Sequence, residues 1–279
     1  MAQDFDIKTS RGRLRLHQFE TLPTVPVFCL PGLSSNSRVF DALGEYRSAR
    51  GRGILAFDLR GRGWSDITAP GTYGWVNHAL DLFETADALG VERFDLVGHS
   101  MGAFASMAAS KMDADRRIRR IVLIDGLGIP TQSGLAAIVA GLARLRGAFA
   151  TRTAYVDAVR NAGLASPWNA YWERHYRYDL IETAAGVRSR TDVAAVTEDA
   201  QYGATQDVRA LWPRLVAPAL VLRAMVPLGR ARDSFIVTRA DYDAFLQRSP
   251  HARGAEIEAN HFGIVMDPAS LAAIDAFLN

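Results

Sequence analysis

The sequence predicts an α/β protein with a mostly parallel central sheet, helices on both faces of that sheet, and an inserted helical segment. Short, apolar, β-branched runs alternate with helical stretches along most of the chain, a pattern typical of such a sheet. The alternation stops between about residues 127 and 208, where the sequence is helical in character and no run resembles a strand. We therefore expect a core made of residues 1–127 and 208–279, and a helical cap, or lid, made of residues 128–207.

The individual elements of the core follow from hydrophobic periodicity and from helix-start signals. The expected strands are residues 25–30, 53–59, 94–98, 118–124, 219–223 and 254–257. The expected helices are residues 77–90, 103–112, 239–248 and 269–278. The last helix has the clearest start, because Asp267 can cap it and Pro268 suits its first position.

Composition narrows the class of protein. The chain has 279 residues, is 49% apolar and carries a net charge of +2, which is ordinary for a globular protein and leaves no basic patch for nucleic acid. The first residues lack the features of a signal peptide, and no apolar run is long enough to span a bilayer. Cys29 is the single cysteine, so no internal disulfide and no thiolate metal cluster can form. We expect a cytoplasmic protein without membrane or nucleic-acid partners; the oligomeric state stays open.

The pentapeptide Gly-His-Ser-Met-Gly at residues 98–102 is the most informative motif. It lies between an expected strand and an expected helix, so it forms a tight turn in which Gly98 and Gly102 avoid clashes with both elements. Such a turn strains the backbone and exposes the serine hydroxyl. We therefore predict that Ser100 is a nucleophile and that the Met101 N–H, at the helix N-terminus, faces a developing oxyanion.

A serine nucleophile needs a base, and the base needs a carboxylate that orients it. His261 is the best candidate base because it directly follows the last strand, whereas His175 lies in the cap and His251 precedes that strand. Asp125 ends the strand after the serine and is the favoured acid. Asp233, further along the loop after the strand at 219–223, remains the alternative.

Two loops after the first strands carry further motifs. The turn Pro31-Gly32-Leu33 is expected to aim the Leu33 N–H at Ser100, which gives a second donor for the oxyanion beside Met101. The glycine-rich loop at residues 58–65 lacks the lysine of a phosphate-binding loop and is interpreted as structural, with Asp58 and Arg60 expected to brace it as an ion pair.

Aromatic residues gather in the expected cap. Trp168, Tyr171, Trp172 and Tyr176 recur at helical spacing, which is more typical of a packed cap interior than of a binding surface. Trp168 and Trp172 are nevertheless candidates for substrate contact, together with Phe262 beside the expected base.

These motifs resemble those of the α/β-hydrolase superfamily, and the resemblance covers nearly the whole chain. The turn at 31–33 is similar to that family's oxyanion segment, and the loop at 58–65 is similar to its Asp-x-Arg-Gly-x-Gly-x-Ser loop. The pentapeptide at 98–102 is similar to its nucleophile elbow, and the segment at 260–262 is similar to its histidine loop. The resemblance also implies a helical cap after Asp125. Many members carry the acid soon after the strand at 219–223, and its absence there favours Asp125, a known variant.

Together these features predict a cofactor-independent, metal-free serine hydrolase that cleaves a carboxylic ester or lactone of a small, largely apolar substrate. Hydrolysis of a carbon–carbon bond in a vinylogous diketone, or of an amide, is the alternative within enzymes, because the same three side chains serve all of these reactions. A ligand receptor on the same scaffold is the alternative from another class.

Overall fold

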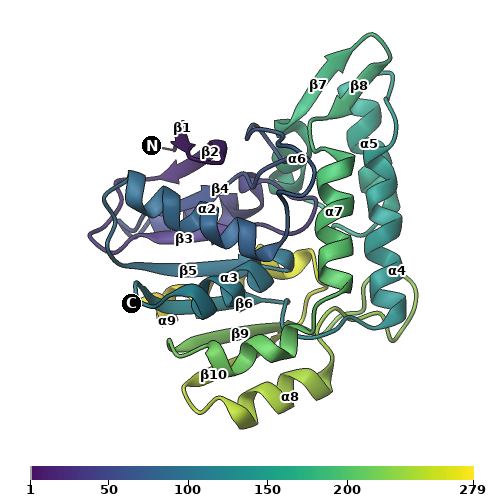
Figure 1. The fold of residues 1–279 in the computed structure, drawn as a ribbon. Coiled ribbons are helices and arrows are strands. Elements are labelled where there is room, and N and C mark those ends of the chain that lie inside the picture. Colours follow the sequence, from purple (N-terminus) through teal and green to yellow (C-terminus); the bar gives the residue numbers. More distant parts are fainter. Residues whose placement is uncertain (1) are drawn as a thin grey trace.

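The computed structural model describes residues 2–279 and is built around one eight-stranded sheet (Figure 1). The strand order is β1-β2-β4-β3-β5-β6-β9-β10. All pairings from β4 to β10 are parallel, so the mostly parallel sheet predicted from the sequence is confirmed. The strands are β1 (Gln3–Thr9), β2 (Gly12–Phe19), β3 (Val27–Leu30), β4 (Ile54–Phe57), β5 (Phe94–His99), β6 (Ile118–Ile124), β9 (Ala219–Ala224) and β10 (Ala252–Ile257).

The N-terminal hairpin of β1 and β2 is not among the predicted elements. Both strands pair antiparallel, β1 with β2 and β2 with β4, and they form one edge of the sheet. Apolar and polar side chains alternate in the first part of β2: Leu14 and Leu16 are buried, while Arg13 and Arg15 are partly exposed. A strand with only one covered face has this period, which differs from the continuous apolar runs of the central strands.

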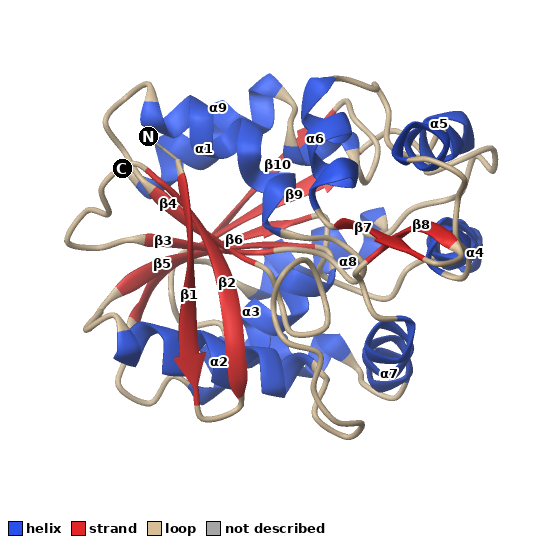
Figure 2. Ribbon diagram, turned by 90° about the horizontal axis from the view of Figure 1, so that it is seen from above, coloured by secondary structure: helices blue, strands red, loops and turns tan. Residues whose placement is uncertain are grey.

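Helices cover both faces of the sheet (Figure 2). Alternate side chains of each central strand supply the two cores. Phe28 and Leu30 of β3 pack in the core with the helices of one face, whereas Val27 and Cys29 pack in the core with the helices of the other. One face carries α2 (Trp75–Ala88), α3 (Met101–Met112) and α8 (Arg239–Arg248), and the other carries α1 (Asp41–Ser48) and α9 (Pro268–Leu278).

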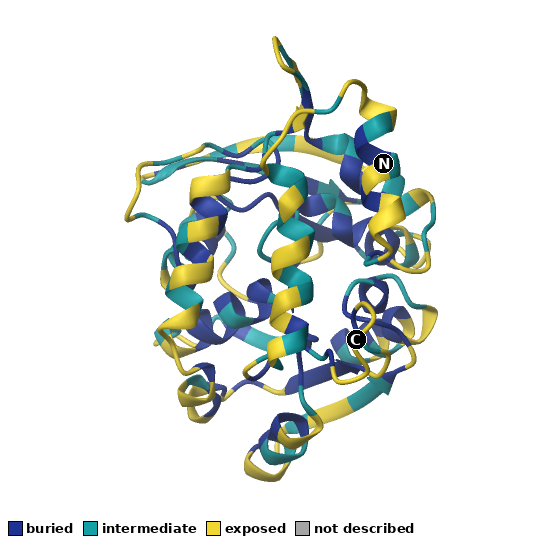
Figure 3. Ribbon diagram, turned by 90° about the vertical axis from the view of Figure 1, so that its right-hand side faces the viewer, coloured by how far each residue is buried: buried dark blue, intermediate teal, exposed yellow. Residues whose placement is uncertain are grey.

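The segment between β6 and β9 lies across the ends of the strands. Helices α4, α5 and α7 stand side by side there, and seen from that side they expose one flank to solvent (Figures 1 and 3). This placement puts the segment over the edge at which β5 and β6 deliver residues 100 and 125. Its elements are α4 (Gln132–Gly141), η2 (Leu142–Leu145), α5 (Arg152–Ala162), α6 (Ala170–Tyr178), β7 (Leu180–Thr183), β8 (Gly186–Ser189), α7 (Val193–Ala204) and η3 (Val208–Arg214).

The expectation that no strand interrupts this segment is wrong. The short strands β7 and β8 form an antiparallel hairpin, and Phe149 adds an isolated bridge to Val187. Each strand has four residues, and the turn between them brings the Thr183 hydroxyl to the Gly186 carbonyl. Four-residue strands with charged side chains at solvent-facing positions do not produce a periodic signal long enough to separate them from helix.

The expected ion pair between Asp58 and Arg60 is also wrong. Asp58 accepts hydrogen bonds from the Trp64 backbone N–H, at 2.8 Å, and from the Tyr178 hydroxyl, at 2.9 Å. Arg60 instead pairs with Asp81 of α2. The loop at 58–65 therefore joins the core to α6 and to α2, rather than closing on itself.

A second buried charge cluster attaches the inserted segment to the core. Asp199 of α7 binds Arg62 at 2.6 Å and His78 of α2 at 3.0 Å, and all three side chains are fully buried. Burial alone would raise the pKa of the Asp199 carboxyl, but His78 and Arg62 outweigh it, and the pKa lies below its usual range. The carboxylate also accepts the backbone N–H of Gly74 at 2.6 Å, so it is held from three directions.

Replacement of Asp199 by asparagine is expected to lower the free energy of unfolding by about 3–5 kcal/mol, because it leaves Arg62 buried without its counter-ion. Urea titration at pH 7 measures this loss. Asp243→Asn is the control, since Asp243 forms only an exposed pair with Arg239. A loss no larger than that of the control contradicts the anchoring role.

The pH dependence of that loss has a definite sign. The pKa of Asp199 is lowered on folding, so its stabilisation is complete above the unfolded-state value of about 3.9 and disappears as the pH falls through the lower folded-state value. The difference between the wild-type protein and Asp199→Asn should therefore shrink on acidification.

Candidate active site

Ser100 occupies the turn between β5 and α3 with a backbone conformation that is rare for a residue with a side chain. Its φ is +55° and its ψ is −121°. The turn is closed too tightly for other residues at its flanks: a Cβ at Gly98 would overlap the Gly102 carbonyl, and one at Gly102 would overlap the Leu30 carbonyl. The strained turn that the pentapeptide predicts is therefore present.

The structure brings Ser100, His261 and Asp125 together, although they are far apart in the sequence. The His261 Nε2 lies 3.1 Å from the Ser100 Oγ, and its Nδ1 lies 2.8 Å from the Asp125 Oδ2. His261 and Asp125 are almost completely buried, with 3% and 1% of their surfaces exposed. Because each residue follows a strand of the parallel sheet, the chain topology alone delivers all three to one edge.

Of the two candidate acids, Asp125 is the one beside His261. It directly follows β6, with a φ of +42°, and its backbone N–H binds the Leu222 carbonyl at 2.8 Å. Its Oδ1 accepts the Ala224 N–H at 3.0 Å, which leaves Oδ2 directed at the imidazole. Asp233 is exposed in the loop after β9, where its backbone carbonyl accepts the Thr131 hydroxyl at 2.8 Å.

The two residues expected to donate to the oxyanion, Leu33 and Met101, both lie near Ser100. Gly32 is so close that a Cβ there would stand 3.2 Å from the Ser100 Cβ, and its carbonyl closes a turn with Ser35 at 3.1 Å. That turn carries Leu33. Met101 is the first residue of α3, and its N–H is among those that a helix leaves without an internal acceptor. Leu33, Ser100 and Met101 line the same cavity.

Two polar side chains that the sequence did not single out support the histidine loop. His99 donates its Nε2 proton to the His261 carbonyl at 3.0 Å, and burial keeps the pKa of His99 far below its usual value, so that it is neutral. Asn260 accepts the Gly263 N–H at 2.8 Å and donates to the Leu164 carbonyl at 3.0 Å. Asn260 thus connects the histidine loop to the inserted segment directly next to His261. The only sequence signal for these two roles is position: His99 directly precedes Ser100, and Asn260 directly precedes His261.

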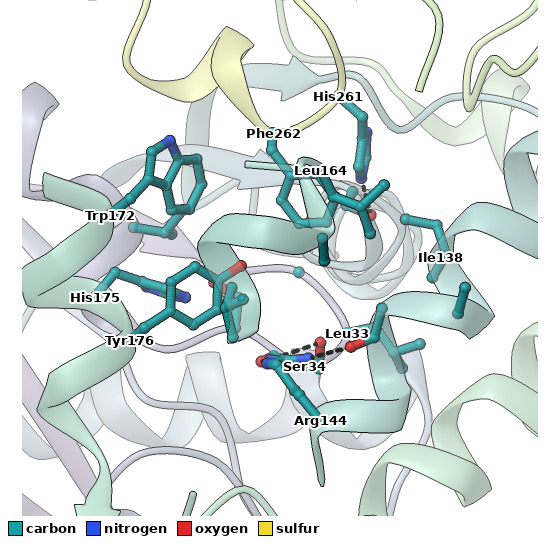
Figure 4. Close-up of a pocket in the computed structure, with 18 of the residues that line it drawn as sticks. Leu33, Ser34, Ile138, Arg144, Leu164, Trp172, His175, Tyr176, His261 and Phe262 are labelled. Carbon is teal, nitrogen blue, oxygen red and sulfur yellow. Dashed lines mark hydrogen bonds between the residues drawn. The ribbon is translucent and has the colours of Figure 1, made fainter. Parts of the chain in front are cut away.

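A cavity of about 330 Å³ is lined in part by Ser100 and His261. Figure 4 shows the side chains around it. Trp172 and Phe262 line it, with their rings 6.0 Å apart. Trp168 is not among the lining residues and stacks instead on Tyr176, with the ring planes 7° apart. Two of the three predicted substrate contacts therefore face this cavity, and the third supports its wall.

A second cavity, of about 360 Å³, lies on the side of Ser100 toward α3 and α7. Trp75, Phe104 and Leu135 make its wall largely apolar. Leu33, Ser100 and Ile138 line both cavities, so the serine stands where the two adjoin. A bound molecule can therefore extend from the hydroxyl in two directions.

Residues 2–279 contain neither a cluster of side chains arranged to hold a metal ion nor a helix that could span a membrane. No group of three or more His, Cys, Asp or Glu side chains is arranged to hold a metal ion. No helix in this range combines the length and the apolar character needed to cross a bilayer.

The fold and this arrangement of side chains place the chain among the hydrolases. The chain belongs to the alpha/beta hydrolase family, whose model matches residues 27–274. The resemblance drawn from the motifs is thereby confirmed.

Curated relatives match shorter stretches. A 2-hydroxymuconate semialdehyde hydrolase from Pseudomonas putida is 36% identical over 97 residues, which is 33% of each protein. An N-formylmaleamate deformylase from Pseudomonas putida is 34% identical over 100 residues, covering 34% of this chain and 35% of the relative. The chain thus aligns with about one third of the length of these two relatives.

Solved structures match nearly the whole chain. An E-2-(acetamidomethylene)succinate hydrolase superposes with a TM-score of 0.86 at 23% identity, covering 100% of this chain and 99% of the other. An alpha/beta hydrolase from Novosphingobium aromaticivorans superposes with a TM-score of 0.81 at 26% identity, covering 99% and 98%. The common architecture extends from the first strand to the last helix.

Proposed function

We propose that the protein is a serine hydrolase that cleaves a carboxylic ester or lactone through an acyl-enzyme. The observation that carries the proposal is the continuous chain of hydrogen bonds from the Asp125 carboxylate through His261 to the Ser100 hydroxyl, beside a cavity. An imidazole held on one nitrogen by a carboxylate presents its other nitrogen as a base. Neither a cofactor nor a metal ion takes part in the proposed reaction.

The proposed reaction has two halves. Ser100 Oγ attacks the substrate carbonyl while His261 Nε2 takes the hydroxyl proton, and the backbone N–H groups of Leu33 and Met101 stabilise the oxyanion. The oxyanion collapses, the bond to the leaving oxygen breaks, and His261 returns the proton to that oxygen. Water then attacks the acyl-serine, His261 again takes and returns a proton, and the acid leaves with Ser100 restored.

The cavities favour an ester or lactone of modest size with apolar parts. Trp172 and Phe262 in one cavity, and Trp75 and Phe104 in the other, offer apolar walls beside the serine. The names of the two Pseudomonas relatives, a semialdehyde hydrolase and a deformylase, support carbon–carbon bond or amide hydrolysis as the alternative at the same site. Each of these reactions passes through an oxyanion next to Ser100.

Short-chain p-nitrophenyl esters test the proposal directly. We expect steady release of p-nitrophenol over many turnovers, and stoichiometric labelling by a fluorophosphonate that peptide mapping assigns to Ser100, because only an activated serine reacts in both assays. Release of one equivalent followed by arrest is the result expected of a receptor. Steady turnover without labelling of Ser100 would assign the reaction to another residue.

A further inference from the structure

Arg144 points into the cavity beside Ser100 without an acidic partner. It belongs to η2 and is half-buried. Its Nη1 donates to the Gly141 carbonyl at 3.0 Å, and its Nη2 donates to the Ser34 carbonyl and hydroxyl at 2.7 and 3.2 Å. Its Nε–H is buried and has no hydrogen-bond partner. Within residues 2–279, no carboxylate lies within ion-pair distance of this guanidinium.

The four buried arginines of the described chain are neutralised. Each forms an ion pair with an aspartate or glutamate, because an unpaired charge away from water is costly. The pairs are Arg47–Asp275, Arg60–Asp81, Arg62–Asp199 and Arg223–Glu256. Arg144 is half-buried and forms no such pair with the described residues, and it lines the cavity beside Ser100, where a bound molecule can supply a negative charge.

Most of the groups around Arg144 are neutral, and the one carboxylate among them has other partners. The ring of Tyr176 lies 5.5 Å from the guanidinium carbon, and the Tyr155 hydroxyl is close, with burial raising its pKa to about 12. Burial, together with the positive charge of Arg144, lowers the pKa of His175 to about 3, so that this imidazole is neutral near pH 7. The Asp179 carboxylate is nearby but is already bound by the Ser189 and Thr191 hydroxyls. At this end of the cavity the guanidinium therefore has a buried N–H without a hydrogen-bond partner and no carboxylate of the described residues in direct contact.

We propose that Arg144 binds a carboxylate of the substrate, so that the enzyme hydrolyses anionic esters or lactones whose carboxylate lies away from the bond that is cleaved. The inference rests on the proposed function, since it concerns the substrate of the same serine. Figure 4 shows Arg144 and His261 on opposite sides of the cavity, so one molecule can reach both the guanidinium and the reacting centre.

A carboxylate matches the site better than a phosphate does. The guanidinium offers planar N–H donors suited to two carboxylate oxygens, and a single positive charge balances a single negative one. Most of the remaining wall, including Val159, Leu164 and Phe262, is apolar, which provides nothing for the second charge of a phosphate. The substrate class is thus a compact, mostly apolar molecule with one charged end.

Paired esters separate this role from a merely structural one. Mono-p-nitrophenyl glutarate carries a free carboxylate, whereas p-nitrophenyl pentanoate is a neutral ester of the same chain length. After subtraction of the uncatalysed rates, we expect the wild-type protein to prefer the glutarate in kcat/KM. Arg144→Gln should lower kcat/KM for the glutarate by roughly 10- to 100-fold, mainly through KM, and change the pentanoate by less than about threefold.

Two further variants complete the experiment. Arg146→Gln, an exposed residue of the same segment, is the matched control and should leave both esters unchanged. Arg144→Lys keeps the charge and should recover part of the preference for the glutarate, whereas a residue that only holds the Ser34 loop would give equal losses on both esters.

The outcomes also separate this inference from the proposed function. Turnover of both esters by the wild-type protein at equal efficiency, or equal losses in Arg144→Gln, overturns the carboxylate site while leaving the serine hydrolase intact. Absence of turnover on either ester contradicts the proposed function itself.

Discussion

Ser100→Ala is expected to lower kcat for p-nitrophenyl esters by roughly four to six orders of magnitude, the largest effect of any single substitution in this protein. The reason is that His261 Nε2 then has no hydroxyl to deprotonate, and no other serine or cysteine occupies the end of β5. Residual rates would come from the cavity and the backbone N–H donors alone. Steady-state kinetics with active-site titration of the wild type measures the difference.

Ser110→Ala is the control for that substitution, because Ser110 lies at the far end of the same helix and its hydroxyl binds the Arg214 carbonyl. Both variants should keep the wild-type circular dichroism spectrum. Activity of Ser100→Ala within tenfold of the wild type would mean that another group performs the attack.

The second large effect is expected at the carboxylate. Asp125→Asn should lower kcat by about 10⁴-fold, because an amide at this position no longer accepts the Nδ1 proton reliably and favours the wrong tautomer of His261. The fold should persist, since the asparagine oxygen can still accept the Ala224 N–H. Kinetics on p-nitrophenyl esters, with thermal unfolding as a check on folding, tests both statements.

Asp233→Asn supplies the matched comparison, as it makes the same chemical change in the alternative acid. Asp233 is exposed and its carboxylate is not the partner of His261, so its replacement should change kcat by less than about twofold. If Asp233→Asn is instead the more damaging of the two, the assignment of the acid is reversed.

Local geometry explains which parts of the site could be predicted from sequence. The strained turn at Ser100 depends on glycines at fixed offsets, so the pentapeptide at residues 98–102 is enough to predict it. His261 and Asp125 were found because parallel strands end at one edge of the sheet, which makes the order of elements a guide to position. Their catalytic roles remain predictions that the substitutions above test.

Other features depend on contacts that spacing does not reveal. Asp58 and Arg60 lie two residues apart, yet each finds its partner elsewhere, one on α6 and the other on α2. Arg144 is an ordinary residue of an amphipathic segment in the sequence, and only the folded chain shows that its Nε–H is buried without a partner among the described residues. The hairpin of β7 and β8 is too short for a periodic pattern. In all three cases the outcome depends on contacts between segments that are distant in the sequence or too short to show a pattern.

The unfavourable backbone angles of Ser100 have an evolutionary consequence. A torsion of this kind costs about 1–3 kcal/mol and persists only where adjacent elements leave the chain no alternative. Selection for reactivity therefore extends to positions that never meet a ligand, such as Gly98 and Gly102, where even one added methyl group would collide with main-chain oxygens. At these two positions the residue is constrained by the space that it must leave empty, not by a contact with a ligand.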